Sequence, residues 1–77
     1  MEIVEKYDYK EVDVYCINER RYLSTREISV TIDFEKSEIK GDCIAYGEWY
    51  KLDIEECKEI LKAIPKEERL RNYEIFL

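Results

Sequence analysis

The segment 28–34, ISVTIDF, constrains the fold more than any other part of the chain. Apolar residues occupy its even-numbered positions, from Ile28 to Phe34, and polar residues occupy its odd-numbered positions. Successive side chains of a β-strand point to opposite faces of the sheet, so this alternation predicts a strand that is buried on one face only. The other face of the sheet is therefore expected to be open to solvent or to a partner.

Two further segments favour strands on either side of this one. Residues 12–18, VDVYCIN, alternate less strictly, and residues 43–50, CIAYGEWY, combine small and aromatic side chains. The polar stretch that contains Gly41 allows the chain to reverse, so that 43–50 returns as an antiparallel neighbour of 28–34. The three segments are then expected to be strands of one β-meander.

A helix is predicted to begin at about residue 53 and to end near residue 63. Asp53 is a good N-cap, and Glu56 stands three residues further on, as in a capping box. Pro65 is expected to end the helix, because it has no backbone N–H to donate. The apolar residues of the segment recur at helical spacing, which predicts that Ile60 and Leu61 are buried against the sheet.

The segment 43–50 and the tail 66–77 leave alternatives open. With simple alternation, Cys43, Ala45 and Gly47 face the helix and let it lie close to the sheet; a bulge at Gly47 is the alternative, because a glycine inside a strand often marks one. The tail fits either a helix or a strand. We expect a short helical turn near 66–71 followed by a short strand.

These elements predict a small α+β fold. We expect an antiparallel β-meander of three or four strands, with one α-helix packed on one face, as a single domain over residues 1–77. A chain of 77 residues buries a limited fraction of its surface on folding, so its stability is expected to be modest or supplemented.

Charge and composition restrict the partners and the habitat. The formal net charge of −6 at pH 7 disfavours direct binding to nucleic acid. The sequence contains neither an apolar run of about 20 residues nor a signal peptide, so it predicts no membrane contact and a cytoplasmic location. Gln is absent and Asn occurs only at Asn18 and Asn72. This scarcity favours a thermophilic microbe, an archaeon among the candidates, or one of its viruses; a mesophile with an AT-rich genome is the alternative.

The side-chain inventory argues against catalysis. The chain has no histidine, which removes His-based acid–base chemistry and most transition-metal sites. The three cysteines, Cys16, Cys43 and Cys57, have no CxxC spacing. They are expected to be small buried hydrophobes, with a disulfide to Cys57 as the alternative. We therefore predict no catalytic residue, no metal and no cofactor, and we do not expect an enzyme.

The aromatic content points instead to a contact surface. Seven tyrosines and one tryptophan are many for so short a chain, and both residue types dominate the energetics of protein interfaces. The predicted partner-binding residues are Tyr15, Thr31, Tyr46 and Tyr50, which we place together on the open face of the sheet.

Two functions agree with this reading. The first is a non-enzymatic protein-binding module or small regulatory subunit that uses an open, tyrosine-bearing sheet face or an edge strand. Its partner would be another protein or, through self-association, a second copy in a homodimer. The alternative is an acidic inhibitor that mimics nucleic acid and occupies a basic groove of a nucleic-acid-binding protein.

Overall fold

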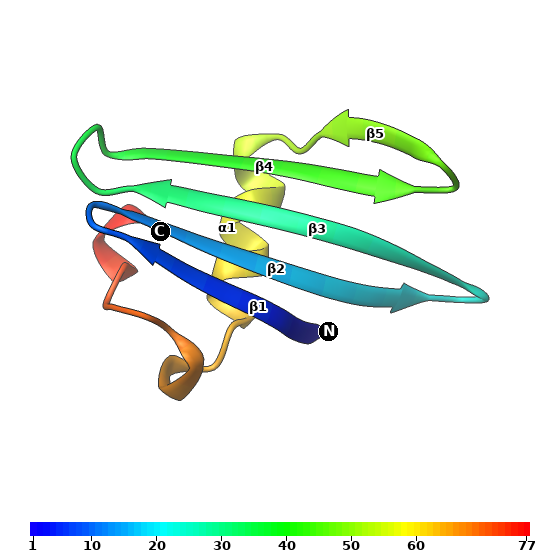
Figure 1. Cartoon of the computed structure of the whole chain (residues 1–77), viewed down its shortest axis with the longest axis horizontal. Helices are drawn as coiled ribbons and strands as arrows, with labels where there is room; N and C mark the ends of the chain where they lie inside the picture. Colours follow the sequence, from blue (N-terminus) through cyan, green and yellow to red (C-terminus); the bar gives the residue numbers. More distant parts are fainter.

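The computed structural model describes the backbone of residues 1–77 and every side chain except that of Arg21. One antiparallel sheet dominates the fold, with its strands in sequence order from β1 to β5 (Figure 1). The strands are β1 (Glu2–Tyr9), β2 (Val12–Arg21), β3 (Ser24–Asp33), β4 (Glu38–Ala45) and β5 (Glu48–Lys51). The predicted α+β meander is thus confirmed in class, but it has five strands where three or four were predicted.

Helix α1 (Ile54–Ala63) crosses one face of this sheet and leaves the opposite face uncovered (Figure 1). We call the uncovered surface the open face. After α1 the tail forms two 3₁₀ turns, η1 (Lys66–Glu68) and η2 (Glu74–Phe76), and runs back along the sheet toward the β1–β2 turn. No helix in the described part of the chain is long and apolar enough to cross a membrane.

The helix begins and ends where the sequence predicts. The Asp53 side chain accepts a hydrogen bond of 2.8 Å from the Glu56 backbone N–H, which confirms the N-cap. The last helical residue is Ala63, two residues before Pro65. Ile60 and Leu61 are both buried in the core, as predicted.

The segment 43–50 is a hairpin and not one strand. Cys43 and Ala45 pack against the core, as simple alternation predicted, but Gly47 neither faces the helix nor forms a bulge. Tyr46 and Gly47 form the turn of the hairpin, with φ angles of 54° and 77°. Two consecutive positive φ values are the signature of the two-residue turns that match the twist of paired strands. Glycine tolerates this conformation because it has no Cβ. Gly47 therefore ends β4, and the residues beyond it belong to the separate strand β5.

The sequence predicted a chain reversal at the stretch that contains Gly41, and this was wrong. Gly41 lies within β4, opposite Val30. The reversal comes earlier, at residues 34–37, where the Asp33 carboxylate accepts hydrogen bonds from the backbone N–H groups of Glu35 and Lys36. A Cβ at Gly41 would approach the Cys57 Sγ atom of α1 to 2.5 Å. Glycine is required here because the helix lies directly against the strand.

The two ends of the chain differ from the prediction. Residues 2–9 have no strict alternation, yet they form β1 at the edge of the sheet, where most of their side chains are exposed. The predicted strand in the tail is absent from the structure, because η2 occupies that position. Tyr73 of the tail is fully buried, and Leu70, Phe76 and Leu77 pack against the core. The tail therefore completes the apolar layer that α1 begins.

Candidate protein-binding surface

The register of the strands divides their side chains between the two faces. On the helix-covered face Tyr15 lies opposite Val30, and both side chains have no exposed surface. On the open face Val14 lies opposite Thr31, and Thr31 lies opposite Lys40. These open-face residues are partly or fully exposed.

Tyr15 does not reach the open face, so its predicted position was wrong. Its phenol oxygen accepts a hydrogen bond of 2.9 Å from the Leu70 backbone N–H, and its ring meets that of Tyr73 edge to face at 6.0 Å. Burial raises the pKa of the Tyr15 phenol, although its hydrogen bond with Leu70 acts in the opposite direction. The tail supplies these partners, which makes Tyr15 a core residue.

Asp13 is two residues before Tyr15 in β2, so its side chain lies on the same helix-covered face. It is the one fully buried charged residue among those described. Two nitrogens of Arg71 donate to its two carboxylate oxygens, each at 3.0 Å, and Arg71 also bonds Asp8 at 2.9 Å. Burial raises the pKa of Asp13, and the Arg71 guanidinium opposes that rise. This pairing is what allows a carboxylate to point toward the core.

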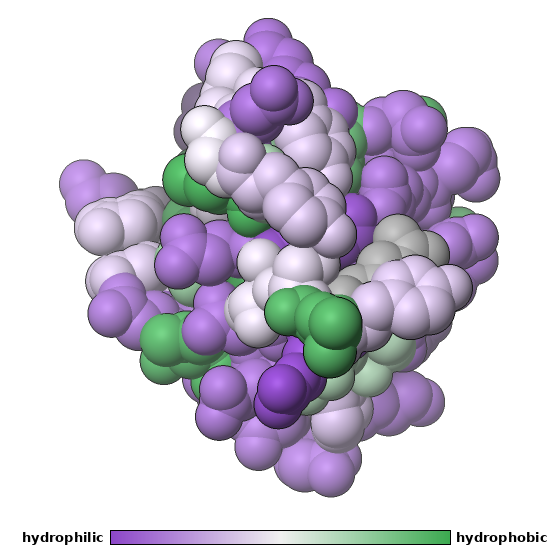
Figure 2. Space-filling model, turned by 90° about the vertical axis from the view of Figure 1, so that its right-hand side faces the viewer, coloured by the Kyte–Doolittle hydropathy of each residue, from purple (hydrophilic) through white to green (hydrophobic). Residues whose placement is uncertain are grey.

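Tyr46 and Tyr50 lie at one end of the sheet and not on the open face. Tyr46 is in the β4–β5 turn, 85% exposed, and its hydroxyl is 2.8 Å from that of Ser24. Tyr50 pairs with Cys43 on the helix-covered face. Both line a shallow pocket that also includes Tyr22. Figure 2 looks onto this end of the molecule, where hydrophobic residues form small, separate patches among hydrophilic ones.

Of the four residues predicted to bind a partner, Thr31 alone lies on the open face. The structure therefore does not bring Tyr15, Thr31, Tyr46 and Tyr50 together as one surface. Other tyrosines do stand on that face, because Tyr7 and Tyr9 of β1 lie opposite Val14 and Val12. Their rings are stacked, with centroids 5.8 Å apart.

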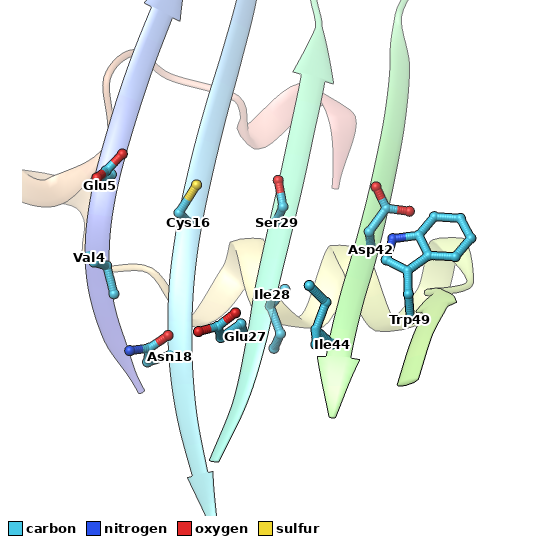
Figure 3. Close-up of a pocket in the computed structure, with 10 residues that line it drawn as sticks. All are labelled: Val4, Glu5, Cys16, Asn18, Glu27, Ile28, Ser29, Asp42, Ile44 and Trp49. Carbon is cyan, nitrogen blue, oxygen red and sulfur yellow. The ribbon is translucent and has the colours of Figure 1, made fainter. Parts of the chain in front are cut away.

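The main hollow of the open face is a groove of about 440 Å³ (Figure 3). Residues of all five strands line it, namely Val4, Glu5, Cys16, Asn18, Glu27, Ile28, Ser29, Asp42, Ile44 and Trp49. The short side chains of Cys16 and Ser29 lie opposite each other in the middle of the sheet, which leaves room above them. Val4 lies on the β1 side of the groove, and Trp49 lies on the β5 side.

A bulge shapes the β1 side of the groove. The register shifts between Ile3 and Glu5, so that Ile3 lies opposite Ile17 and Glu5 lies opposite Cys16. Val4 is the extra residue, and it lines the groove together with Glu5. Bulges re-aim side chains and interrupt regular pairing at sheet edges, and this one adds an apolar side chain to the open face.

Large apolar side chains are exposed around this groove. The exposed fraction is 52% for Val4, 46% for Ile44 and 60% for Trp49. Ile44 and Trp49 are cross-strand partners, so they form one continuous apolar wall. Apolar and aromatic side chains at the centre of a surface, with polar groups around them, are typical of protein interfaces.

The groove also contains three carboxylates, those of Glu5, Glu27 and Asp42. No ion pair joins any of them to another side chain that the structure describes. Lys51 lies opposite Asp42 in the register but makes no ion pair with it. The groove is therefore both apolar and negatively charged.

The cysteines of the described structure are free thiols. Cys43 and Cys57 are buried on the helix-covered face, while Cys16 lies in the groove. Burial and the charge of Glu5 raise the pKa of the Cys16 thiol, so it stays protonated and is a poor nucleophile. The described Cys, Asp and Glu side chains form no cluster of three or more that could hold a metal ion.

Sequence reasoning missed Val4, Ile44 and Trp49 as surface residues. Gly47 was a partial hairpin signal, but Tyr46 before it is not a usual residue of a two-residue turn, so the pairing of Ile44 with Trp49 was not predicted. The bulge at Val4 left no signal in the sequence. The polar positions of β3 were visible, but alternation alone does not separate a groove carboxylate from a solvated one.

Comparison of the chain with protein-family models, with curated proteins and with solved structures found no match. The function is therefore argued from the geometry of the site.

Proposed function

We propose that this chain is a non-enzymatic protein-binding module that presents the open face of its sheet to a protein partner. The observation that supports this most is the groove between Val4 and Trp49, two apolar side chains that are each more than half exposed. Leaving such groups in water costs about 25 cal/mol for each Å² that a partner could bury. A partner on this face would remove that surface from water.

The open face offers the other features of an interface. Tyr7 and Tyr9 extend the aromatic surface along β1, and tyrosine and tryptophan are enriched among the residues that dominate binding energy. Lys40 lies opposite Thr31 and Lys51 lies opposite Asp42 on the same face. The face therefore combines exposed apolar side chains with charges of both signs, and both occur in protein interfaces.

An acidic inhibitor that mimics nucleic acid is the second candidate, and fewer observations support it. A mimic needs rows of unpaired carboxylates that a basic groove can recognise. Five of the 19 acidic residues pair with arginines of the described chain: Asp8 and Asp13 with Arg71, Glu19 and Glu56 with Arg26, and Glu74 with Arg69. The carboxylates of the groove are unpaired, but they lie among apolar side chains.

Removal of the apolar walls of the groove tests the proposal. The tagged chain is purified from cells that produce it naturally, and the proteins that co-purify are compared with those held by the Val4→Ala/Trp49→Ala variant. We expect the variant to lose its partner, because truncation of an interface hot spot costs about 2 kcal/mol or more. The affinity of the reconstituted complex then gives the size of the loss.

The matched control is Tyr22→Ala/Leu23→Ala, which also removes one aromatic and one aliphatic side chain. These residues form the β2–β3 turn and are 92% and 100% exposed. The control is expected to keep the partner. Loss of the partner in the control, or in a Tyr46→Ala/Tyr50→Ala variant, with full binding by Val4→Ala/Trp49→Ala, would move the interface to the end of the sheet and contradict the proposal.

A further inference from the structure

The groove runs across the strands and not along them. Glu5, Cys16, Ser29 and Asp42 stand in one cross-strand row on β1 to β4. Five strands at a spacing of about 4.8 Å extend over about 19 Å from β1 to β5, which is the length of about five or six extended residues. A short extended peptide therefore matches the groove in length.

The carboxylates of the groove form no ion pair within the described part of the chain, although Lys40 lies close enough for its charge to interact with that of Asp42. On the helix-covered face, Arg26 bonds Glu19 at 2.9 Å and Glu56 at 3.0 Å. Glu27 is adjacent to Arg26 in the sequence, but its side chain lies on the open face, where it makes no ion pair with any described side chain. The same is true of Asp42. Lys51 lies opposite Asp42 but forms no ion pair with it, so the carboxylates of the groove are available to a cation from another molecule.

Trp49 adds a second feature that suits a cation. Its side chain is 60% exposed and lines the groove together with Asp42 and Glu27. A cationic group over the face of an indole gains about 0.5–1 kcal/mol at exposed sites, and tryptophan is the best of the aromatic residues for this contact. Asp42 lies beside Trp49, while Glu27 lies on β3 opposite Ile44 (Figure 3). An aromatic face beside a carboxylate is suited to a guanidinium or an ammonium group with an apolar stem.

We propose that the groove binds an extended segment of a partner protein through at least one arginine or lysine side chain. This inference rests on the proposed function and deepens it, because it specifies the chemistry of the partner. The cationic head would pair with Asp42 beside Trp49, the charge of Glu27 would add to the negative potential of the groove, and the aliphatic stem would lie along Trp49 and Ile44. Arginine suits the site better than lysine, because its planar group can both stack and form paired hydrogen bonds with a carboxylate.

The charge of the chain disfavours other occupants. A second copy has the same formal net charge of −6, so it would bring further negative charge to an acidic groove. Nucleic acids and anionic lipid surfaces meet the same repulsion. Charge complementarity therefore selects a basic segment.

A titration with a synthetic peptide tests the inference. The peptide alternates arginine with serine, and a matched peptide replaces each arginine with glutamate. Trp49 is the only tryptophan of the chain, so a change in its emission reports directly on the groove. We expect the arginine peptide to change the emission and to bind more weakly as salt is added, while the glutamate peptide has no effect.

Variants locate the binding. Glu27→Gln/Asp42→Asn is expected to weaken binding of the arginine peptide by about tenfold or more, because hydrogen bonds between charged groups are lost. The matched control is Glu55→Gln/Glu59→Gln, which removes the same charge from exposed positions of α1. It is expected to change binding by no more than about threefold, because exposed charges more than a Debye length away are screened.

Several results would overturn the inference. They are an absence of binding, equal binding of the two peptides, and an equal loss in the groove variant and the helix control, which would show attraction by net charge alone. Circular dichroism confirms that each variant is folded. If the natural partner is lost with Val4→Ala/Trp49→Ala but retained by Glu27→Gln/Asp42→Asn, the protein-binding face stands and the basic occupant is wrong.

Discussion

The two faces of the sheet differ in whether their charged and aromatic side chains are buried and have partners within the chain. On the helix-covered face Asp13 is fully buried and paired with Arg71, and the tyrosine hydroxyls of Tyr15 and Tyr73 both have backbone partners. On the open face Glu27 and Asp42 have no ion-pair partner among the described side chains. Trp49 is more than half exposed.

Under the proposed function, this difference separates the face that stabilises the fold from the face that binds a partner. The polar groups buried on the helix-covered face find their partners within the chain, since all buried side-chain N and O atoms in the described structure have hydrogen-bond partners. The open face contains apolar surface and charge that the fold itself does not use. Substitutions on the first face should therefore act on folding, and substitutions on the second should act on binding.

The largest contrast should come from two aliphatic side chains on opposite faces. Leu61→Ala is expected to reduce the free energy of unfolding by about 2–5 kcal/mol, because Leu61 is fully buried and leaves a cavity. Ile44→Ala on the open face should cost about 1 kcal/mol or less, the value of a cross-strand pair. Urea denaturation measures both. Equal losses would mean that the open face also belongs to the core.

Ion pairs should show the same asymmetry. Arg71→Ala leaves Asp13 buried and unpaired, so we expect a loss of about 3 kcal/mol, toward the lower end of the range for a broken buried pair, because Arg71 is partly exposed. Lys40→Ala breaks the exposed pair with Glu38 and should cost about 0–1 kcal/mol. Unfolding by urea at pH 7 compares the two variants.

The pH dependence of the Arg71→Ala variant tests the cause. The pKa of Asp13 is already raised by burial, and removal of Arg71 takes away the group that lowers it. A raised pKa means that the folded state binds the proton more tightly than the unfolded state. The stability of the variant relative to the parent should therefore recover as the pH falls through that pKa. A constant difference between pH 7 and pH 4 would contradict a role for the Asp13 charge.

Close packing of the helix should appear as an interaction between two residues. Gly41→Ala is expected to cost about 1–3 kcal/mol, because the new Cβ would overlap with the Cys57 Sγ atom. In a Cys57→Ala background the same change should cost less, since the overlapping atom is gone. A double-mutant cycle by thermal or chemical unfolding measures this coupling, and strict additivity would show that the helix has room to shift.

The smallest effect concerns the start of the helix. Asp53→Ala removes the hydrogen bond to the Glu56 backbone N–H and should cost about 1 kcal/mol. Glu55→Ala, two residues further on in the first turn of α1, is the control and should cost a few tenths of a kcal/mol through the helix dipole. Equal values in chemical denaturation would show that the cap contributes no specific stability.

Local patterns predicted much of this fold. The alternation of 28–34 marked β3, and Asp53 and Pro65 marked the two ends of α1. These signals depend on neighbours in the sequence, so they could be interpreted without the tertiary structure. The hairpin at Tyr46 and Gly47 had a local signal too, but the tyrosine at a position that needs positive φ concealed it.

The orientation of β2 could not be predicted in this way. Its two sides are similarly apolar, and what turns Tyr15 and Asp13 inward is the tail, through Leu70, Arg71 and Tyr73. These contacts join residues more than 50 positions apart. Because Tyr15 was assigned to the wrong face of the sheet, the predicted set of binding residues was not a single surface. The expectation of an open sheet face depended only on the alternation in β3, and it was confirmed.

The stability of the Val4→Ala/Trp49→Ala variant tests most directly whether the open face is free of a structural role. Circular dichroism during urea unfolding gives its free energy of unfolding beside that of the parent chain. We predict a loss of about 1 kcal/mol or less, because both side chains are at least half exposed and surface substitutions change stability by about 0.5 kcal/mol each. A loss above about 3 kcal/mol, in the range of core truncations, would contradict the division between a stabilising face and a binding face.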